Sequence, residues 1–383
     1  MNQPFYKIES KINIIRHFTP NWFTVTMGTG VVALIISELP FLHSQLYALG
    51  TVLWLINIVL FITFSILYAL RWIFFYQEAK LILKHSSMLF FLGAIPMGLA
   101  TIINGCLKYG IMMFGNDNHI VAIAQNLWYL DAVLAFLVAL FVPAMMFTRQ
   151  DHQLHSMTAI WLLPIVTAEV TASSGGILLA HTMAPLDAIN ILVGSYMLWG
   201  ISVLPAFSIL TILFLRMAVH KLPEQQMAIS GCLALGPIGT GALALLLLGK
   251  QATHVLAYIH MEALGQIMHY TGIMGSIILI GFGLWWLAMA IFTIYKHLNI
   301  NFSFNLGWWG LTFPLGVYSL AILELAKQLN MQIISYIGYG LTLFLVVLWV
   351  MVICKTLLGA YRGTLFISPC LIAELNKKKE YAN

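Results

Sequence analysis

Long apolar stretches separated by short polar segments run along the whole sequence. Stretches of about 20 apolar residues, the length that spans a membrane as a helix, lie at 19–37, 46–72, 87–108, 120–147, 157–181, 186–215, 228–249, 263–295, 304–326 and 332–358. The pattern therefore predicts ten transmembrane helices. Several stretches exceed the minimum, which indicates tilt or extension beyond the lipid. The stretch 263–295 can also accommodate an interfacial turn at Thr271 and Gly272.

Prolines recur in register on alternate helices of this set. Pro20, Pro96, Pro164, Pro237 and Pro314 are separated by 76, 68, 73 and 77 residues (96−20, 164−96, 237−164, 314−237). A proline within a helix bends it and frees a carbonyl, which must be satisfied by protein or by a water-lined cavity. The register predicts five helical hairpins that run in the same direction, as parallel repeats. Five odd helices would ring a central pore with quasi-fivefold symmetry, and five even helices would screen them from lipid.

The composition places the chain in a membrane. Hydrophobic residues make up 61% of it and charged residues 8%, whereas charged residues are about a quarter of a soluble domain. If the N-terminus is cytoplasmic, only Lys108, Lys250 and Lys327 fall outside, and the other fifteen of the 18 basic residues (18 − 3) fall inside. This positive-inside bias predicts that both termini are cytoplasmic, which requires an even number of spans.

The distribution of charged and apolar residues also indicates the domain boundaries and the kind of partner. The basic residues lie in short loops rather than in one patch, so the net charge of +5 indicates orientation in a lipid bilayer and no nucleic-acid partner. We expect a cytoplasmic segment at 1–17, a transport domain at 18–358 and a basic cytoplasmic tail at 359–383. The apolar run 18–36 is too long for a signal-peptide core, so the N-terminus is expected to be retained. Lys377, Lys378 and Lys379 are expected to anchor the tail on anionic lipid.

Small residues cluster near the prolines of the odd helices. They either let helices pack closely or leave room for a solute beside the backbone. Their recurrence in register with the prolines favours a pore lining. The predicted lining residues, beside the five prolines, are Gly28, Thr29, Gly30, Gly175, Gly239 and Thr240.

Two acidic residues lie within predicted spans, where a charge is costly. Glu169, five residues after Pro164, could carry a coupling proton, or it could hold neighbouring helices together by hydrogen bonding. Asp131 is in a screening helix, which favours a hydrogen bond between helices or between protomers. The four cysteines and the pair His152 and His155 lack the spacing of a metal site. No metal and no cofactor is predicted.

Four groups of residues resemble the tellurite-resistance/dicarboxylate transporter family. They are PNWF (20–23) with MGTG (27–30), WLLPIV (161–166) with SGG (174–176), GPIGTG (236–241), and WW (308–309) with TFP (312–314). They occur in the right order and cover nearly the whole chain. The family includes the bacterial tellurite-resistance membrane protein, the yeast malate permease, fungal sulfite efflux pumps and the plant guard-cell slow anion channel.

The resemblance implies ten helices around an anion pore, a pore gate at Phe313, and a homotrimer of independent pores. No Lys or Arg falls in mid-span, so selectivity would depend on backbone and hydroxyl donors. The expected function is transport of a C4-dicarboxylate such as malate across the inner (plasma) membrane, without catalysis. A sulfite exporter and a gated monovalent-anion channel of the same fold are alternatives. A membrane redox or enzyme subunit is a more distant one, because the histidines lie mostly in loops.

Overall fold

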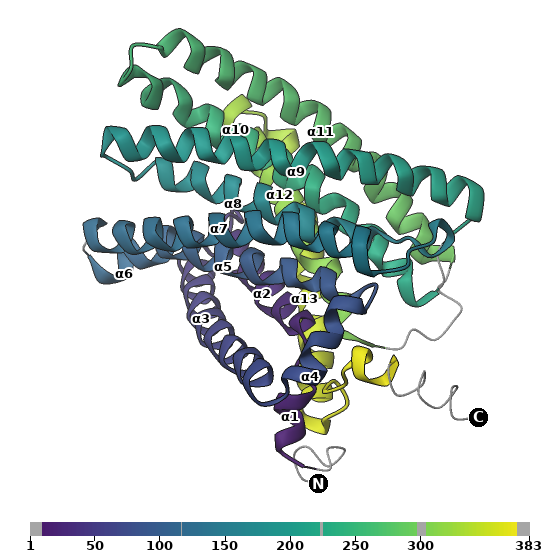
Figure 1. Cartoon of the computed structure of the whole chain (residues 1–383). Helices are drawn as coiled ribbons and strands as arrows, with labels where there is room; N and C mark the ends of the chain where they lie inside the picture. The colour runs from purple at the N-terminus through teal and green to yellow at the C-terminus, as the bar shows by residue number, and fades with distance from the viewer. Residues whose placement is uncertain (1–9, 116, 223–224, 297–303, 374–383) are drawn as a thin grey trace, which may run out of the picture.

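The computed structural model describes residues 10–115, 117–222, 225–296 and 304–373 (Figure 1). The regular elements in these ranges are all helices, and no strand occurs in them. Nine helices of the described part are long and apolar enough to cross a membrane, and one more apolar helix, Pro20–Ile36, is shorter. The chain is therefore an all-helical, multi-pass membrane protein. The predicted lipid anchor, Lys377, Lys378 and Lys379, lies outside the described residues.

Five long α-helices form an outer layer. They are α3 (His43–Phe74), α7 (Asp117–Arg149), α9 (Pro185–His220), α11 (Glu262–Lys296) and α13 (Gln332–Arg362). Only 22% to 33% of the residues in their most apolar windows are buried, as expected of helices that turn one face to lipid. Helix α11 runs through Thr271 and Gly272 without a break, so the interfacial turn considered there is wrong.

The inner elements have two parts, a 3-10 segment followed by an α-helix. They are η1 (Pro20–Trp22) with α2 (Phe23–Ile36), η3 (Met88–Gly93) with α5 (Ala94–Gly105), η6 (Ala159–Leu162) with α8 (Leu163–Leu179), η7 (Gln225–Ala234) with α10 (Leu235–Ala257), and η8 (Leu306–Leu311) with α12 (Thr312–Leu329). In the four longest, 78% to 94% of the most apolar window is buried. The shorter elements are α1 (Ile12–Arg16), α4 (Tyr76–Ala79), η2 (Lys80–Lys84), the π-helical η4 (Cys106–Gly110), α6 (Ile111–Phe114) and η5 (Leu154–Ser156).

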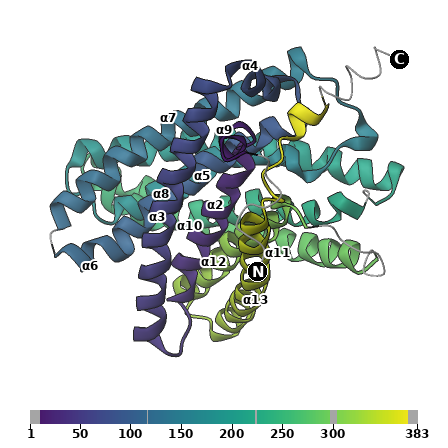
Figure 2. The ribbon, with the colours of Figure 1, turned by 90° about the horizontal axis from the view of Figure 1, so that it is seen from below.

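The inner α-helices form a closed ring. Helix α2 contacts α5, α5 contacts α8, α8 contacts α10, α10 contacts α12, and α12 contacts α2. Each outer helix packs on the inner helix that precedes it, and Figure 2 shows α3 beside α2 and α13 beside α12. In the view of Figure 1, α9 lies between α7 and α11 and passes in front of the inner helices. The segregation into inner and outer helices is the arrangement that the alternating prolines predict.

The five prolines lie at the mouths of the inner helices, four of them just after the change from 3-10 to α-helix and Pro20 at the start of its 3-10 segment. Pro96, Pro237 and Pro314 are the third residues of α5, α10 and α12, Pro164 is the second of α8, and Pro20 begins η1. N–H groups in the first turn of an α-helix have no partner within it, so a proline there costs the α-helical part no hydrogen bond. The sequence shows the repeat but not this change of helix type.

A buried arginine holds the C-terminal segment 364–373 against the ring. Arg71, near the end of α3, is 1% exposed. Its Nη1 donates to the carbonyl of Phe18 at 2.8 Å, and its Nη2 donates to the Ser368 hydroxyl at 3.1 Å. Phe366 stacks on Trp22 with ring centroids 4.9 Å apart. The segment therefore lies at the N-terminal end of α2.

Replacing Arg71 by alanine is expected to release this segment. A hydrogen bond to a charged group contributes about 1.5–3 kcal/mol, so amide exchange in residues 364–373 should become about 10- to 100-fold faster. Hydrogen exchange followed by mass spectrometry measures this directly. Arg149→Ala, which removes an exposed arginine at the end of α7, is the control and should leave the exchange unchanged. Equal exchange in both variants would mean that other contacts hold the segment.

Candidate functional site

A cavity of about 350 Å³ lies inside the ring, towards the C-terminal ends of the inner helices. All five inner helices line it, for example through Val31 of α2, Thr101 of α5, Ser173 of α8, Leu243 of α10 and Val317 of α12. We call it the C-side vestibule. Most of its lining is apolar, and its charged residues are grouped at one end of the inner helices.

A second cavity, of about 300 Å³, lies at the opposite ends of the inner helices and is called the N-side vestibule. Each of the five 3-10 segments contributes to it, and so does the C-terminal segment. Representative lining residues are Asn21, Phe91, Ile160, Leu233, Trp308 and Pro369. The change of helix type in each inner element therefore lies close to the wall of this vestibule.

Between the two vestibules the passage narrows to a space of about 10 Å³. Phe313 lines both this space and the C-side vestibule, and Met27 lines both this space and the N-side vestibule. Met97, Val166 and Gly236 complete the constriction from the other inner helices. A water molecule needs about 10–15 Å³ and polar partners, and these side chains offer none. The constriction is narrow and apolar, and Phe313, 2% exposed, lies at it beside the C-side vestibule.

Of the predicted lining residues, Phe313 and Pro314 border the passage. The glycines lie where helices touch. A Cβ on Gly28 would be 2.3 Å from the Thr312 hydroxyl oxygen, and one on Gly239 would be 2.7 Å from the Tyr318 Cα. These glycines allow inner helices to approach each other.

The remaining predicted residues also make contacts between or within helices. A Cβ on Gly30 would be 2.0 Å from the Thr101 hydroxyl, and one on Gly175 would be 2.1 Å from the Ser195 hydroxyl. Thr29 accepts a hydrogen bond from the Trp349 indole at 3.3 Å. Thr240 donates to the Gly236 carbonyl at 2.7 Å. Pro20, Pro96, Pro164 and Pro237 are not among the residues that line the two vestibules or the constriction.

The two intramembrane acids lie in the protein interior, away from the vestibules. Glu169 is fully buried between α8, α9 and α10, beside Ser202 and Thr240. Its carboxyl oxygens have no hydrogen-bond partner in the described structure, and a charge there would have no countercharge, so the carboxyl is expected to be neutral. Asp131 is also fully buried and accepts a hydrogen bond from Thr171 at 2.7 Å, which joins α7 to α8.

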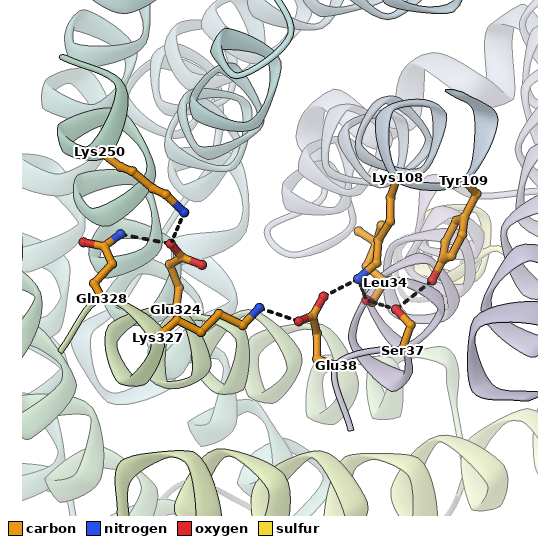
Figure 3. Close-up of polar contacts among 9 residues, drawn as sticks. All are labelled: Leu34, Ser37, Glu38, Lys108, Tyr109, Lys250, Glu324, Lys327 and Gln328. Carbon is orange, nitrogen blue, oxygen red and sulfur yellow. Dashed lines mark hydrogen bonds and ion pairs between the residues drawn. The ribbon is translucent and has the colours of Figure 1, made fainter. Parts of the chain in front are cut away.

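A group of charged side chains lies at the far end of the C-side vestibule (Figure 3). Glu38, in the turn after α2, pairs through Oε1 with Lys108 and through Oε2 with Lys327, the latter at 2.5 Å. Glu324 pairs with Lys250 at 3.3 Å and accepts a hydrogen bond from the Gln328 amide at 2.9 Å. In the described part of the chain no group of three or more His, Cys, Asp or Glu side chains is placed to hold a metal.

This charged group is not predicted as a site from the sequence, although the sequence contains a signal for it. Lys108, Lys250 and Lys327 are the three basic residues that depart from the positive-inside pattern. Each follows the proline of its own inner helix by 12 or 13 residues (108−96, 250−237, 327−314). Residues in equivalent positions of a ring meet at the same end of it. The structure accordingly brings Lys108 and Lys327 to the lining of one vestibule, and Lys250 pairs with Glu324 of the same lining.

The lysines keep Glu38 ionised. Burial disfavours its charged form, but attraction and hydrogen bonding by Lys108 and Lys327 outweigh this effect and lower the pKa of Glu38 from 4.5 to about 2. Because the folded-state pKa is lowered, the pairing stabilises the fold fully above about pH 4.5, and this stabilisation is lost as the pH falls towards 2. By residue type the group Lys108, Lys250, Lys327, Glu38 and Glu324 has a formal charge of +1 (3 − 2).

A ring of apolar helices encloses two vestibules and a narrow apolar constriction, which is the arrangement expected of a membrane transport protein or channel. A family model described as "Voltage-dependent anion channel" matches residues 17–357. The chain belongs to this family of anion transporters and channels, and the resemblance drawn from its sequence is confirmed.

Several curated proteins are similar over most of their length. The sulfite efflux pump of Arthroderma otae is 35% identical over 92% of this chain and 93% of its own. An uncharacterised transporter of Methanocaldococcus jannaschii is 32% identical over 94% of this chain and 98% of its own. The malic acid transport protein of Schizosaccharomyces pombe is 22% identical over 88% of this chain and 77% of its own. The sulfite pump is therefore much more similar to this chain than the malate protein is.

Proposed function

We propose that the protein passes small anions through the centre of its helix ring, and that sulfite is its substrate. The observation that carries the pathway is the narrow apolar constriction at Phe313 between two vestibules that all five inner elements line. Sulfite is preferred to malate because of the 35% identity to a sulfite efflux pump against 22% to a malic acid transport protein. Sulfite, an alternative substrate in the sequence-based prediction, thus replaces the C4-dicarboxylate as the preferred substrate.

The proposal retains the finer architecture expected from the sequence. Ten spans, parallel repeats and cytoplasmic termini place the C-side vestibule on the outer face of the plasma membrane. The inner ring and the charge distribution support this orientation, because only three basic residues belong to the C-side ends. A homotrimer of independent pores follows from the family resemblance. The apolar outer faces of α3, α7, α9, α11 and α13 can contact either lipid or a neighbouring protomer.

The substrate is tested by flux through purified protein in liposomes. Vesicles loaded with sulfite, malate, chloride or nitrate are compared at equal concentration, with protein-free vesicles as the control. We expect sulfite efflux to be at least about tenfold faster than malate efflux, which corresponds to a barrier lower by about 1.4 kcal/mol. Faster malate than sulfite would restore the dicarboxylate assignment, and no protein-dependent flux of any of the four would refute the proposal.

Proton coupling through Glu169 remains a separate hypothesis. The buried carboxyl of Glu169, which lies on an inner helix and has no hydrogen-bond partner in the described structure, motivates this hypothesis. The hypothesis is opposed by the fact that Glu169 lines neither vestibule. Glu169→Gln preserves the shape and the neutral state. If Glu169 carries a proton, this variant should lose anion uptake driven by a proton gradient while it keeps anion exchange without a gradient. Unchanged gradient-driven uptake would assign Glu169 to packing alone.

A further inference from the structure

The carboxylate of Glu38 lies between two lysines, in the position that a bound anion would take. Its two carboxylate oxygens bridge two ammonium groups, Lys108 Nζ and Lys327 Nζ, from two different inner helices. All three residues line the C-side vestibule. We propose that the space between Lys108 and Lys327 is an anion-binding site of the transport pathway, which Glu38 occupies in the closed protein and which a small oxyanion takes when Glu38 turns away. This inference rests on the proposed function.

The partners of the two lysines permit such an exchange. Lys108 also donates to the Leu34 carbonyl at 2.8 Å, so its ammonium keeps a protein partner after the carboxylate leaves. Lys327 is 57% exposed, and water can solvate it during the exchange. A sulfite ion offers oxygen acceptors to both lysines, as the carboxylate does, and charge-assisted hydrogen bonds of this kind are strong and short. The incoming anion therefore takes over both lysine contacts that the Glu38 carboxylate makes.

Glu38 is the member of the cluster that lies outside the helical segments. It lies beyond the last residue of α2, in the short turn that leads to α3, whereas Lys108 and Lys327 are on helical segments. Its side chain is 22% exposed. When Glu38 turns away, Lys108 and Lys327 remain at the wall of the vestibule without the carboxylate that joins them.

The second acid of the vestibule has a different environment. Glu324 is held by Lys250 and by Gln328 and does not bridge two lysines. It contributes the same negative charge to the same cavity, but it does not block the space between Lys108 and Lys327. Substituting each glutamate in turn therefore distinguishes local competition for the two lysines from a general effect of negative charge in the vestibule.

The functional consequence is a weak site at this mouth. A carboxylate that is always ionised and always nearby competes with every anion that reaches the lysines, which lowers the affinity of the site. A low affinity favours departure of an anion that leaves through this vestibule. Removing the competitor should strengthen binding and slow departure.

Sodium sulfite binding to full-length protein in lipid nanodiscs, measured by calorimetry, tests the inference. Glu38→Gln removes the competing charge with little change of shape. We expect its half-saturating sulfite concentration to be at least about tenfold lower than that of the parent, which corresponds to about 1.4 kcal/mol. Glu324→Gln is the matched control, with a change of less than about threefold. Lys327→Gln, at an exposed side chain, should raise the half-saturating concentration at least about threefold.

The outcomes are distinct. Equal tightening in Glu38→Gln and Glu324→Gln would reduce the effect to the net charge of the vestibule and overturn the site. Unchanged binding in Lys327→Gln would overturn it as well, and this variant serves even if Glu38→Gln does not fold. If the parent transports sulfite and neither Glu38 nor Lys327 alters binding, the inference fails while the proposed function stands. Absent sulfite transport in the parent refutes the proposed function instead.

Discussion

Replacing Phe313 by alanine is expected to raise anion flux at least about tenfold. The Phe313 side chain borders both the 10 Å³ constriction and the C-side vestibule, so its truncation joins the two spaces. A wider passage can hold water, and an anion then keeps part of its hydration as it crosses. A tenfold increase requires a barrier lower by only about 1.4 kcal/mol, and opening a narrow apolar constriction should exceed this. Flux and current in proteoliposomes measure the effect.

The control for this variant is Leu320→Ala. Leu320 lies on the same helix and lines the C-side vestibule but not the constriction, so its truncation enlarges the cavity without opening the passage. Removing a buried phenylalanine costs about 3–5 kcal/mol of folding free energy, so size-exclusion profiles must show that the Phe313 variant is folded. A folded Phe313→Ala protein with the flux of the parent would remove Phe313 as the gate.

The all-helical class and the separation into inner and outer helices were largely accessible from the sequence. Apolar runs predict membrane helices because lipid demands about 20 apolar residues per span, and the stretch 186–215 became α9, Pro185–His220. The prolines indicated which helices lie inside. Their position at a change of helix type was not accessible, because hydrophobicity does not distinguish a 3-10 segment from an α-helix when both are buried.

The roles of single residues on the inner helices were less accessible. These helices are apolar on every side, so the sequence does not tell which face of Gly28 or Gly239 turns to the axis. Phe313 was predicted to be the gate through the resemblance, and the structure puts it at the constriction. The charged group around Glu38 was missed because its members lie far apart in the sequence, from residue 38 to residue 327.

Gly239→Ala is expected to destabilise the protein strongly, although it adds a single methyl group. The new Cβ would lie 2.7 Å from both the Cα and the N of Tyr318. Backbone atoms cannot rotate away, so α10 and α12 must separate, and overpacking of this kind costs about 1–3 kcal/mol or more. The Tyr318 hydroxyl donates to the Ile280 carbonyl at 2.6 Å, so the displacement also reaches α11. Thermal unfolding in detergent should show a midpoint lower by several degrees.

Gly281→Ala provides the comparison, because a Cβ at Gly281 meets no atom within 4 Å. Like Gly239→Ala, this variant replaces a glycine by alanine inside a long helix, where alanine is favoured over glycine by about 1 kcal/mol. Its unfolding midpoint should be unchanged or higher. The pair also separates the two interpretations of Gly239. If this glycine lined the passage, alanine would alter flux and leave stability unchanged, whereas a helix contact predicts loss of stability in Gly239→Ala and not in Gly281→Ala.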